Sequence, residues 1–419
     1  MWQSEIGPSE RVAIYGANSD AYLNALQTVW RKGGVAVLCP MRDPVSVIDE
    51  WLAFVDCHKV IVLDAVADSF ESNHAKLFFH EENRQPKVFH FHPSAGTILR
   101  TSGSSSKPKS VFHTVEQHVA NAIGVIEALR VDEKSRWLLS LPLYHVGGLS
   151  IAVRCWLAQA KVVVPPVNFE MQWAIREAGI SHVSLVQTQL LRLLKNPSDI
   201  AALHLLKAIV LGGSDISPEL LKRIQELHLP VVRTYGMTEM ASQITATALN
   251  NFCENLDSSG RLLPGRELKI GEDQEIWVKG PMLFSGYVES TTIFSSRDPD
   301  GWFHTGDRGF IDDNQDLHVL GRLDSMFISG GENVYPESIE RELLSYPDIE
   351  EAMVVARPHE EYGQCPVAFI KFKTDVDLDQ EALVAYLEKR LARFKIPRQF
   401  LPWPSDVPSN GIKIPRSWF

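Results

Sequence analysis

The chain has 419 residues, of which 45% are hydrophobic and 22% charged, and its 41 Lys and Arg against 52 Asp and Glu give a net charge of −11. This composition excludes a disordered chain, a collagen-like repeat and a disulfide-stapled miniprotein. The acidic balance leaves no overall basic field for a nucleic acid or an anionic membrane. We therefore expect small-molecule partners and no nucleic acid, and a homo-oligomer is compatible with the sequence.

The cysteines and the N-terminus indicate the cellular compartment. The five cysteines lie far apart and form no CxxC pair, which favours reduced structural thiols over a disulfide framework or a zinc site. The first ten residues lack the basic and apolar regions of a secretory signal, and no apolar run approaches the roughly 18 residues of a membrane span. We expect a cytoplasmic protein without a membrane span.

From Arg11 to about Tyr235, short apolar segments alternate with amphipathic ones. This alternation is typical of βαβ units, which form mostly parallel sheets with helices on both faces. Ligands of such sheets bind beyond the carboxyl ends of the strands. Expected strands include 11–17, 35–40, 182–186 and 206–213, and expected helices include 20–34, 43–56, 187–195 and 217–228.

The pattern changes after Gly260. Short strands punctuated by Gly, Pro and Asp predict a small β-rich subdomain over 260–322 within a large domain of residues 1–322. Residues 323–419 alternate again and are numerous enough for a small α+β C-terminal domain with its own core. In that domain we expect helices over 336–347 and 379–394 and strands over 349–358 and 365–374.

The segment TSGSSSKPK, from Thr101 to Lys109, follows an apolar strand. Its hydroxyls, backbone N–H groups and ammonium suit a phosphate chain. The Walker A spacing GxxxxGK[ST] is absent. The alternative is a solvated, flexible Ser-rich linker.

A second candidate is YGMTE, from Tyr235 to Glu239, at the end of an apolar strand. A strand-end aromatic ring can stack on a base, the hydroxyl of Thr238 can bond a phosphate, and the Glu239 carboxylate can hold Mg²⁺. The alternative is an ordinary strand-to-helix turn in which Thr238 is the N-cap.

Three further segments carry charged candidates. HTGDRG places Asp307 in a tight Gly-flanked turn, where its carboxylate can accept both hydroxyls of a ribose. Arg322 can reach the same sugar or a phosphate, with surface salt bridging as the alternative. Lys413 follows Gly411 near the end of the chain, and an isolated terminal lysine is usually solvated.

In this order, the five motifs resemble those of the adenylate-forming superfamily of acyl-CoA synthetases, peptide-synthetase adenylation domains and luciferases, and the resemblance runs from about Arg11 to the C-terminus. It implies a carboxylate that attacks the α-phosphate of ATP, giving an acyl-adenylate and pyrophosphate, and a thiol of coenzyme A that then displaces AMP. ATP and Mg²⁺ are the implied cofactors, with coenzyme A as co-substrate. Mg²⁺, ammonium groups and backbone dipoles would offset the repulsion between the anions.

The resemblance also implies a role for each matching residue. Glu239 would hold the metal, Thr238 would contact the α-phosphate, and Lys413 would bridge the attacking carboxylate and the α-phosphate. Tyr235 would pack on adenine and Asp307 would bind the ribose. The implied ATP-binding residues are Thr101, Ser102, Gly103, Ser104, Ser105, Lys109, Gly212, Gly213, Ser214, Tyr235, Gly236, Asp307 and Arg322.

In this superfamily the C-terminal domain rotates between the two half-reactions. The resemblance implies a hinge at Asp324 and a loop with Gly330, Gly331 and Glu332 that approaches the thiol channel. The glycines would let the backbone come close.

Several segments, among them SLVQTQLLRLL and the ending IKIPR, resemble the 2-succinylbenzoate:CoA ligases of menaquinone biosynthesis. His145 then resembles the residue that gates the acyl pocket and is counted as catalytic, with a buried core histidine as the alternative. We expect Arg192, with Thr188, to recognise the second carboxylate of the substrate, because a dicarboxylate needs donors for its non-reacting end. A surface arginine on an amphipathic helix is the alternative.

Two departures from the superfamily pattern bear on activity. Ser105 and Ser106 replace the Thr and the second Gly of TSGSTGxPK, and serine adopts a positive φ less readily than glycine. The segment before Arg11 is shorter than in relatives, so either their first elements are dispensable here or the start is truncated. Alternative functions are another aryl- or acyl-CoA ligase and a degenerate ligase kept as a nucleotide-binding protein. A luciferase-like oxidase would use the same adenylation site.

Overall fold

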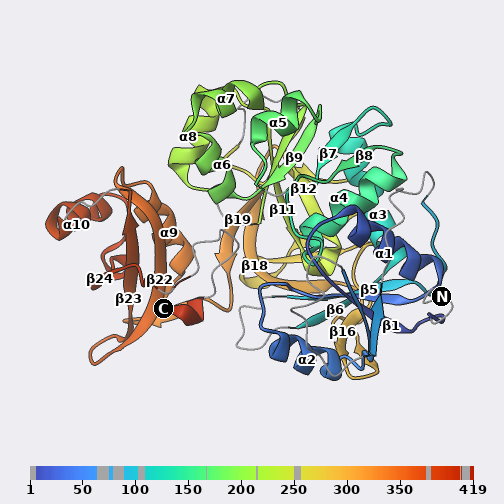
Figure 1. Cartoon of the computed structure of the whole chain (residues 1–419). Coiled ribbons are helices and arrows are strands. Elements are labelled where there is room, and N and C mark those ends of the chain that lie inside the picture. The colour runs from blue at the N-terminus through green and yellow to red at the C-terminus, as the bar shows by residue number, and fades with distance from the viewer. Residues whose placement is uncertain are drawn as a thin grey trace.

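The computed structural model has a large N-terminal part and a smaller C-terminal part (Figure 1). The expected mixed α/β fold, with a large N-terminal domain and a small C-terminal domain, is confirmed. The structure describes residues 6–63, 75–78, 89–101, 109–166, 168–213, 216–249, 256–373, 379–405, 407 and 416–419.

The first sheet has eight strands: β1 (Arg11–Tyr15), β2 (Val35–Leu38), β3 (Lys59–Val62), β4 (Ala75–Phe78), β5 (Gly96–Arg100), β6 (Ser110–Thr114), β16 (Gly286–Glu289) and β17 (Thr292–Phe294). Their order is β17-β16-β6-β5-β2-β1-β3-β4. The strands from β5 to β4 are parallel to one another, and β6, β16 and β17 continue the sheet in antiparallel pairing.

The second sheet has seven strands: β7 (Arg136–Leu138), β8 (Lys161–Val163), β9 (His182–Leu185), β10 (Ala208–Leu211), β11 (Val231–Met237), β12 (Ser242–Ala246) and β13 (Arg261–Leu262). Their order is β13-β12-β11-β10-β9-β7-β8. Strands β7 to β11 are parallel, so the segments that follow β7, β9, β10 and β11 emerge at one edge of the sheet.

Two smaller antiparallel or mixed sheets follow. The third sheet has the order β14-β15-β18-β19, with β14 (Glu267–Ile270), β15 (Glu275–Lys279), β18 (Phe303–Ile311) and β19 (Leu317–Arg322). The fourth sheet consists of β20 (Phe327–Ser329), β21 (Glu332–Val334), β22 (Ile349–His359), β23 (Gly363–Phe372) and β24 (Gln399–Pro402). The stretch 260–322, expected as one subdomain, therefore contributes strands to three sheets, because β13 joins the second sheet and β16 and β17 join the first.

The described helices are α1 (Asp20–Arg31), α2 (Val45–Phe54), α3 (Val115–Leu129), α4 (Val146–Leu157), α5 (Met171–Arg176), α6 (Gln187–Leu193), α7 (Pro197–Leu203), α8 (Pro218–Glu226), α9 (Pro336–Leu344) and α10 (Gln380–Glu388). Short 3₁₀ turns are η3 (Thr238–Met240), η4 (Glu272–Gln274), η5 (Arg393–Lys395) and η6 (Arg416–Trp418). Local capping sets the helix starts: Thr114 and Gln117 form a capping box at α3.

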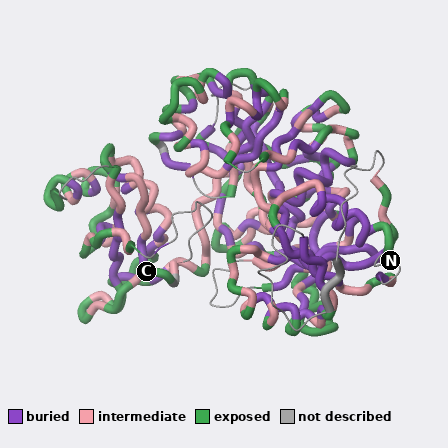
Figure 2. Tube along the Cα trace, in the orientation of Figure 1, coloured by how far each residue is buried: buried purple, intermediate pink, exposed green. Residues whose placement is uncertain are grey.

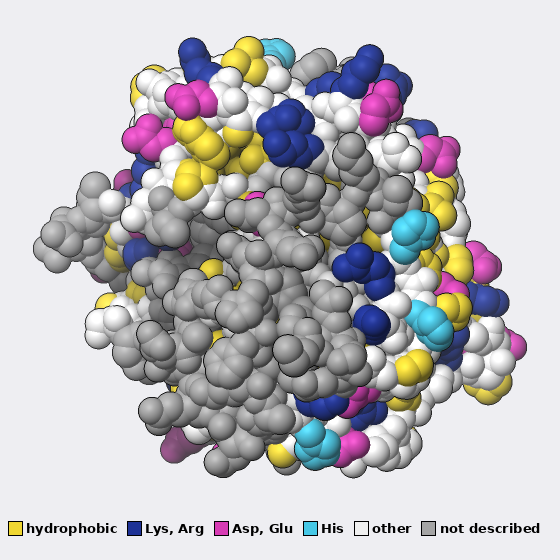
Figure 3. Space-filling model, turned by 45° about the vertical axis from the view of Figure 1, so that its right-hand side comes forward, with side chains coloured by type: hydrophobic (Ala, Val, Ile, Leu, Met, Phe, Trp, Pro, Cys, Tyr) yellow, Lys and Arg dark blue, Asp and Glu magenta, His cyan; other side chains and the backbone are white. Residues whose placement is uncertain are grey.

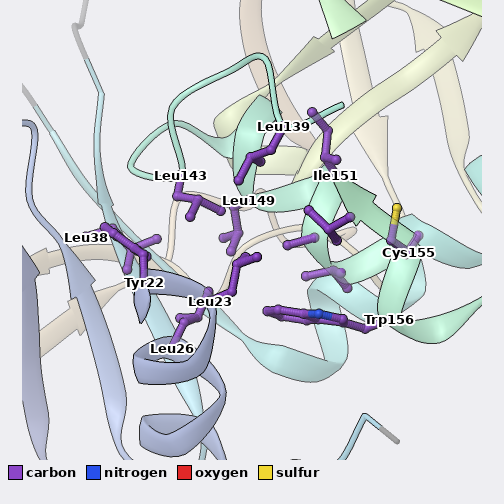
Figure 4. Packing of buried hydrophobic residues seen from close by; sticks show 14 of the residues in the cluster. Tyr22, Leu23, Leu26, Leu38, Leu139, Leu143, Leu149, Ile151, Cys155 and Trp156 are labelled. Atoms are coloured by element: carbon purple, nitrogen blue, oxygen red, sulfur yellow. The ribbon is translucent and has the colours of Figure 1, made fainter. Parts of the chain in front are cut away.

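A shared core joins the first two sheets. One buried cluster contains Ile14 of β1, Val210 of β10 and Leu149 of α4, together with residues of α1 and α3. Figure 4 shows α1 side chains such as Leu23 pointing toward those of α4. Burying such a side chain contributes about 1.5–3 kcal/mol. The C-terminal part has a separate cluster around α9, α10 and the fourth sheet, and Figure 2 shows buried segments in both parts.

Two local expectations are wrong. Asp307 does not lie in a turn but inside β18, where it pairs with Arg322 of β19. Gly306 has φ of 71° and the strand register shifts after Arg308, so this strand is irregular. Glycines at such irregularities are also typical of tight turns, and the sequence pattern therefore indicated a turn. The helix expected over 379–394 ends at Glu388, and beyond it Leu391 and Phe394, the latter in turn η5, pack on the same core.

The described part of the chain has a surface of mixed charge and free cysteines. Acidic and basic side chains are interspersed over the described part of the face in Figure 3. Four cysteines are buried and free, and the fifth, Cys253, lies outside the described residues. Among the helices that the structure describes, none is both long and apolar enough to cross a membrane.

Candidate active site

The turn between β11 and β12 forms the first wall of the site. A Cβ at Gly236 would lie 2.1 Å from the main-chain oxygen of Ser242, so only glycine lets the two strands approach at this register shift. Turn η3 follows with Met237, rather than Thr238, at its N-cap position. The alternative in which Thr238 serves as an N-cap is therefore wrong.

Three outside donors hold the main chain of η3. The carbonyl oxygens of its three residues accept hydrogen bonds of 2.8 Å, in chain order, from the His113 ring, the Phe284 N–H and the Asn121 amide. Burial lowers the pKa of His113 to about 4, so the ring is neutral near pH 7 and presents one N–H to the first carbonyl. The orientation of η3 is thus fixed from β6, from α3 and from the segment before β16.

The backbone directly after η3 is strained. Ala241 has φ of 54° and Ser242 has φ of 127°, values that residues with a Cβ rarely adopt. Such conformations cost about 1–3 kcal/mol each and persist where surrounding contacts impose them. The three donors to η3 are contacts of this kind.

Glu239 is 9% exposed and points at a tyrosine. The hydroxyl of Tyr287 donates a 2.8 Å hydrogen bond to its Oε1 atom. Burial raises the pKa of Glu239, and the hydrogen bond from Tyr287 and the charge of Lys109 offset only part of this effect. A carboxylate in this environment is stabilised by a cation.

The same tyrosine contacts the start of β6. The ammonium of Lys109 lies 4.7 Å from the ring centroid of Tyr287. The N–H of Thr101 donates to the carbonyl of Lys109 at 2.9 Å, so these two residues form the base of the loop that joins β5 to β6. The expected phosphate-binding residues between them (Ser102, Gly103, Ser104 and Ser105) lie outside the described residues.

A carboxylate and two partners form the second wall. Tyr235 donates a 2.7 Å hydrogen bond to Oδ2 of Asp307, and Nη1 of Arg322 lies 3.1 Å from Oδ1. A Cβ at Gly306 would meet Arg322 at 3.2 Å, and the φ of Gly306 is positive. Both features favour glycine beside this ion pair. Three expected nucleotide-binding residues are thus brought together.

Arg322 also contacts the expected hinge. Its Nε and Nη2 atoms lie 3.0 and 2.9 Å from the two carboxylate oxygens of Asp324. Burial lowers the pKa of Arg322, but the hydrogen bonds and charges of Asp324 and Asp307 outweigh this effect and the net shift is upward. The guanidinium therefore stays charged between the carboxylates of Asp307 and Asp324.

Two further residues expected to bind the nucleotide follow β10. Gly212 and Gly213 directly succeed this strand, and Gly213 has φ of 93°. They lie at the same edge of the second sheet as Tyr235, because β10 and β11 are parallel neighbours. Ser214 and Lys413 lie outside the described residues.

The expected acyl side is formed after β7 and β9, which pair with each other. His145 is the N-terminal flanking residue of α4, its ring centroid is 4.7 Å from that of Tyr144, and burial with the nearby charge of Arg42 lowers its pKa to about 4. Thr188 is half-buried in the first turn of α6, and Arg192 is exposed in its last turn. These residues emerge at the edge that also carries Gly212.

The expected CoA-side loop lies at the tip of a hairpin. Gly330 and Gly331 connect β20 to β21 with φ of 59° and 87°, and Glu332 begins β21. All three residues are exposed. The loop is therefore accessible to a partner surface or substrate.

Sequence reasoning missed Tyr287, His113 and Asn121. None belongs to a recognisable motif, and Tyr287 reaches the site only because β16 pairs with β6. No three His, Cys, Asp or Glu side chains of the described residues meet as a metal cluster. Mg²⁺ is nevertheless commonly held by one or two carboxylates together with substrate phosphates and water, so Glu239 fits that ion.

Comparison with known proteins identifies the family. The family model of the AMP-binding enzyme matches residues 2–288, and that of the AMP-binding enzyme C-terminal domain matches residues 338–411. The chain therefore belongs to the AMP-binding enzyme family. It is an adenylate-forming acid:CoA ligase, and the family uses ATP and Mg²⁺.

Individual relatives extend the likeness over nearly the whole chain. The 2-succinylbenzoate–CoA ligase of Listeria monocytogenes serotype 4b is 32% identical over 94% of this chain and 85% of its own. The o-succinylbenzoate CoA synthetase of Bacillus subtilis, in complex with the acyl-adenylate intermediate OSB-AMP, has a TM-score of 0.85 at 28% identity, covering 99% of this chain and 88% of that one. The same synthetase with ATP and a magnesium ion has a TM-score of 0.83 at 28% identity, covering 99% and 90%.

Proposed function

We propose that this ligase activates 2-succinylbenzoate and transfers it to coenzyme A in menaquinone biosynthesis. The supporting observation is the edge of the second sheet, where His145 and α6 follow strands adjacent to those that carry Gly212 and Tyr235. An acyl group held after β7 and β9 would lie beside a nucleotide held after β10 and β11. Relatives of the same reaction class, at 32% identity over 94% of the chain, support the same substrate.

The chemistry follows from the charges. A substrate carboxylate oxygen attacks the α-phosphorus, the bond to the bridging oxygen of pyrophosphate breaks, and an acyl-adenylate forms. Glu239 would hold Mg²⁺, which supplies charge neutralisation on the phosphates when bound. Asp307 would bind the ribose, Thr238 the α-phosphate, and Lys413 both reacting anions. The thiol of coenzyme A then loses its proton and displaces AMP, giving the thioester.

The second carboxylate of the substrate needs a donor, and we assign this role to Arg192 with Thr188. Removing a charged hydrogen bond of this kind costs about 1.5–3 kcal/mol, so Arg192→Ala should raise the KM for 2-succinylbenzoate about 10- to 100-fold. Benzoate, which lacks the second carboxylate, should be affected far less. Arg223→Ala, on the neighbouring exposed face of α8, is the matched control.

The test uses purified protein with ATP, Mg²⁺, coenzyme A and a panel of 2-succinylbenzoate, benzoate, acetate and a medium-chain fatty acid. AMP and thioester are followed by mass spectrometry, with Lys413→Ala as control. Selective 2-succinylbenzoyl-CoA formation that this variant loses is the expected result. Thioester from another acid alone would overturn the substrate, no AMP from any acid would favour the degenerate ligase, and an unchanged KM in Arg192→Ala would refute the arginine assignment.

A further inference from the structure

The last described residues of the chain, Arg416 to Phe419, are bound tightly to the C-terminal part. The guanidinium of Arg416 forms ion pairs with two carboxylates of α9. Its Nη2 atom lies 2.8 Å from Glu337 Oε1, and its Nη1 atom lies 2.5 Å from Glu340 Oε1. Nη2 is also 3.1 Å from Glu340 Oε2, so the pair with Glu340 is bidentate. Bidentate arginine–carboxylate pairs are the stronger kind.

This cluster differs from a surface salt bridge. The side chains of Arg416, Glu337 and Glu340 are 28%, 18% and 15% exposed. Glu340 also accepts the N–H of Val354 at 2.7 Å, which connects the cluster to β22. Burial raises the pKa of Glu340 to about 7, and the charge of Arg416 opposes that rise. Removing Arg416 would therefore leave a poorly solvated carboxylate on α9.

The final residue is held on the same strand. The ring of Phe419 packs against Trp403 and Phe369, with ring centroids 4.8 and 5.2 Å apart. Arg357 of β22 donates to the main-chain oxygen of Phe419. The segment is thus attached at both of its ends.

One carboxylate connects this segment to the expected hinge. Glu337 accepts a 2.7 Å hydrogen bond from the hydroxyl of Ser325, which directly follows Asp324, and the same hydroxyl lies 3.1 Å from the carbonyl of Arg322. The side chain of Glu337 therefore contacts both Arg416, near the end of the chain, and Ser325, at the start of the C-terminal part.

We propose that Arg416 is a positioning residue for the adenylation step, acting by anchoring the C-terminal segment that carries Lys413. This inference rests on the proposed function, in which Lys413 binds the two anions that react in the adenylation step. Three residues of extended chain span at most about 11 Å, so fixing Arg416 restricts the volume in which the Lys413 ammonium can move. A lysine restricted in this way loses less conformational entropy when it binds the two anions.

Measuring the two half-reactions separately distinguishes a positioning role of Arg416 from a general loss of structure. Arg416→Ala should lower the rate of acid-dependent ATP–pyrophosphate exchange about 10- to 100-fold, because small misplacements of a reacting group have effects of this size. Thioester formation from supplied acyl-adenylate and coenzyme A should stay within about twofold of wild type. Arg416→Lys, which keeps the charge but not the bidentate geometry, should lie in between.

Arg390→Ala is the matched control, because Arg390 pairs with another carboxylate of the same helix, Glu342, at 3.8 Å and is more exposed. Equal loss of both half-reactions in Arg416→Ala, or no loss in either, would overturn the proposal. Thermal unfolding of each variant identifies a loss that is caused by misfolding.

Hydrogen exchange supplies a readout that needs no substrate. Peptides covering 405–419 should exchange faster in Arg416→Ala than in wild type and should be unchanged in Arg390→Ala. If the wild-type protein forms no adenylate from any acid, the proposed function fails while this measurement still tests the anchor. Unchanged exchange in Arg416→Ala would refute it.

Discussion

The Tyr235 hydroxyl lies 2.7 Å from Oδ2 of Asp307, although the two residues are 72 positions apart in the chain. Arg322 holds the other carboxylate oxygen at 3.1 Å. Both oxygens of Asp307 are thus oriented by residues of the chain itself. The carboxylate that we propose as the ribose ligand does not depend on the ligand for its arrangement.

Replacing Tyr235 by Phe should weaken ATP binding modestly. The ring is retained for stacking and only the hydrogen bond to Asp307 is lost, which is worth about 1 kcal/mol or somewhat more because the acceptor is charged. We expect the KM for ATP to rise about 3- to 10-fold with a smaller change in kcat. Tyr386→Phe, which loses a hydroxyl bond to Ser345 in the C-terminal part, is the control and should leave this KM unchanged.

Replacing Glu239 by Gln should weaken magnesium binding without lowering the free energy of unfolding. The amide cannot neutralise Mg²⁺, so we expect the Mg²⁺ concentration for half-maximal activity to rise and kcat to fall about 100-fold. Because burial raises the pKa of Glu239, the neutral amide should leave the free energy of unfolding unchanged or increase it. A Mg²⁺ titration and urea unfolding measure the two effects. Wild-type magnesium dependence would contradict the assignment, and exposed Glu289→Gln serves as control.

Replacing His113 should impair catalysis indirectly, through its effect on turn η3. His113→Leu removes the donor to the carbonyl of Thr238, so turn η3 loses one of its three supports. We expect kcat to fall about 10- to 100-fold with little change in the KM for ATP. His113→Gln, which retains a side-chain donor, should recover part of the activity. Equal losses in both variants would indicate a packing role alone.

Two buried histidines should make the protein less stable in mild acid. Burial lowers the pKa of His113 and His182 to about 4, below their ordinary value, so between pH 4 and about 6.5 the unfolded chain binds more protons. The free energy of unfolding therefore falls as pH falls through this window, by about 2 kcal/mol per histidine between pH 7 and 5. Urea unfolding at both values measures it. His182→Gln should show a smaller fall than exposed His58→Gln.

Sequence patterns predicted what is local in this chain. The alternation up to Tyr235 predicted strands and helices, because each period is set within a few residues. The pairing of Asp307 with Arg322 and the arrival of Tyr287 depend on strand register between distant segments, which no local pattern contains. The supports of η3 from His113 and Asn121 are buried polar contacts of the same long-range kind.

The shared guanidinium of Arg322 has a consequence for the order of events. It contacts Asp307, the proposed ribose ligand, and Asp324, the proposed hinge, so turning the chain at Asp324 would release one of the two carboxylates that hold the guanidinium beside Asp307. If Asp307 binds the nucleotide and Asp324 is the hinge, as we propose, nucleotide affinity and domain orientation are reciprocally linked: a domain orientation that AMP favours by some factor binds AMP more tightly by the same factor. The affinity for AMP would then report the orientation of the C-terminal part.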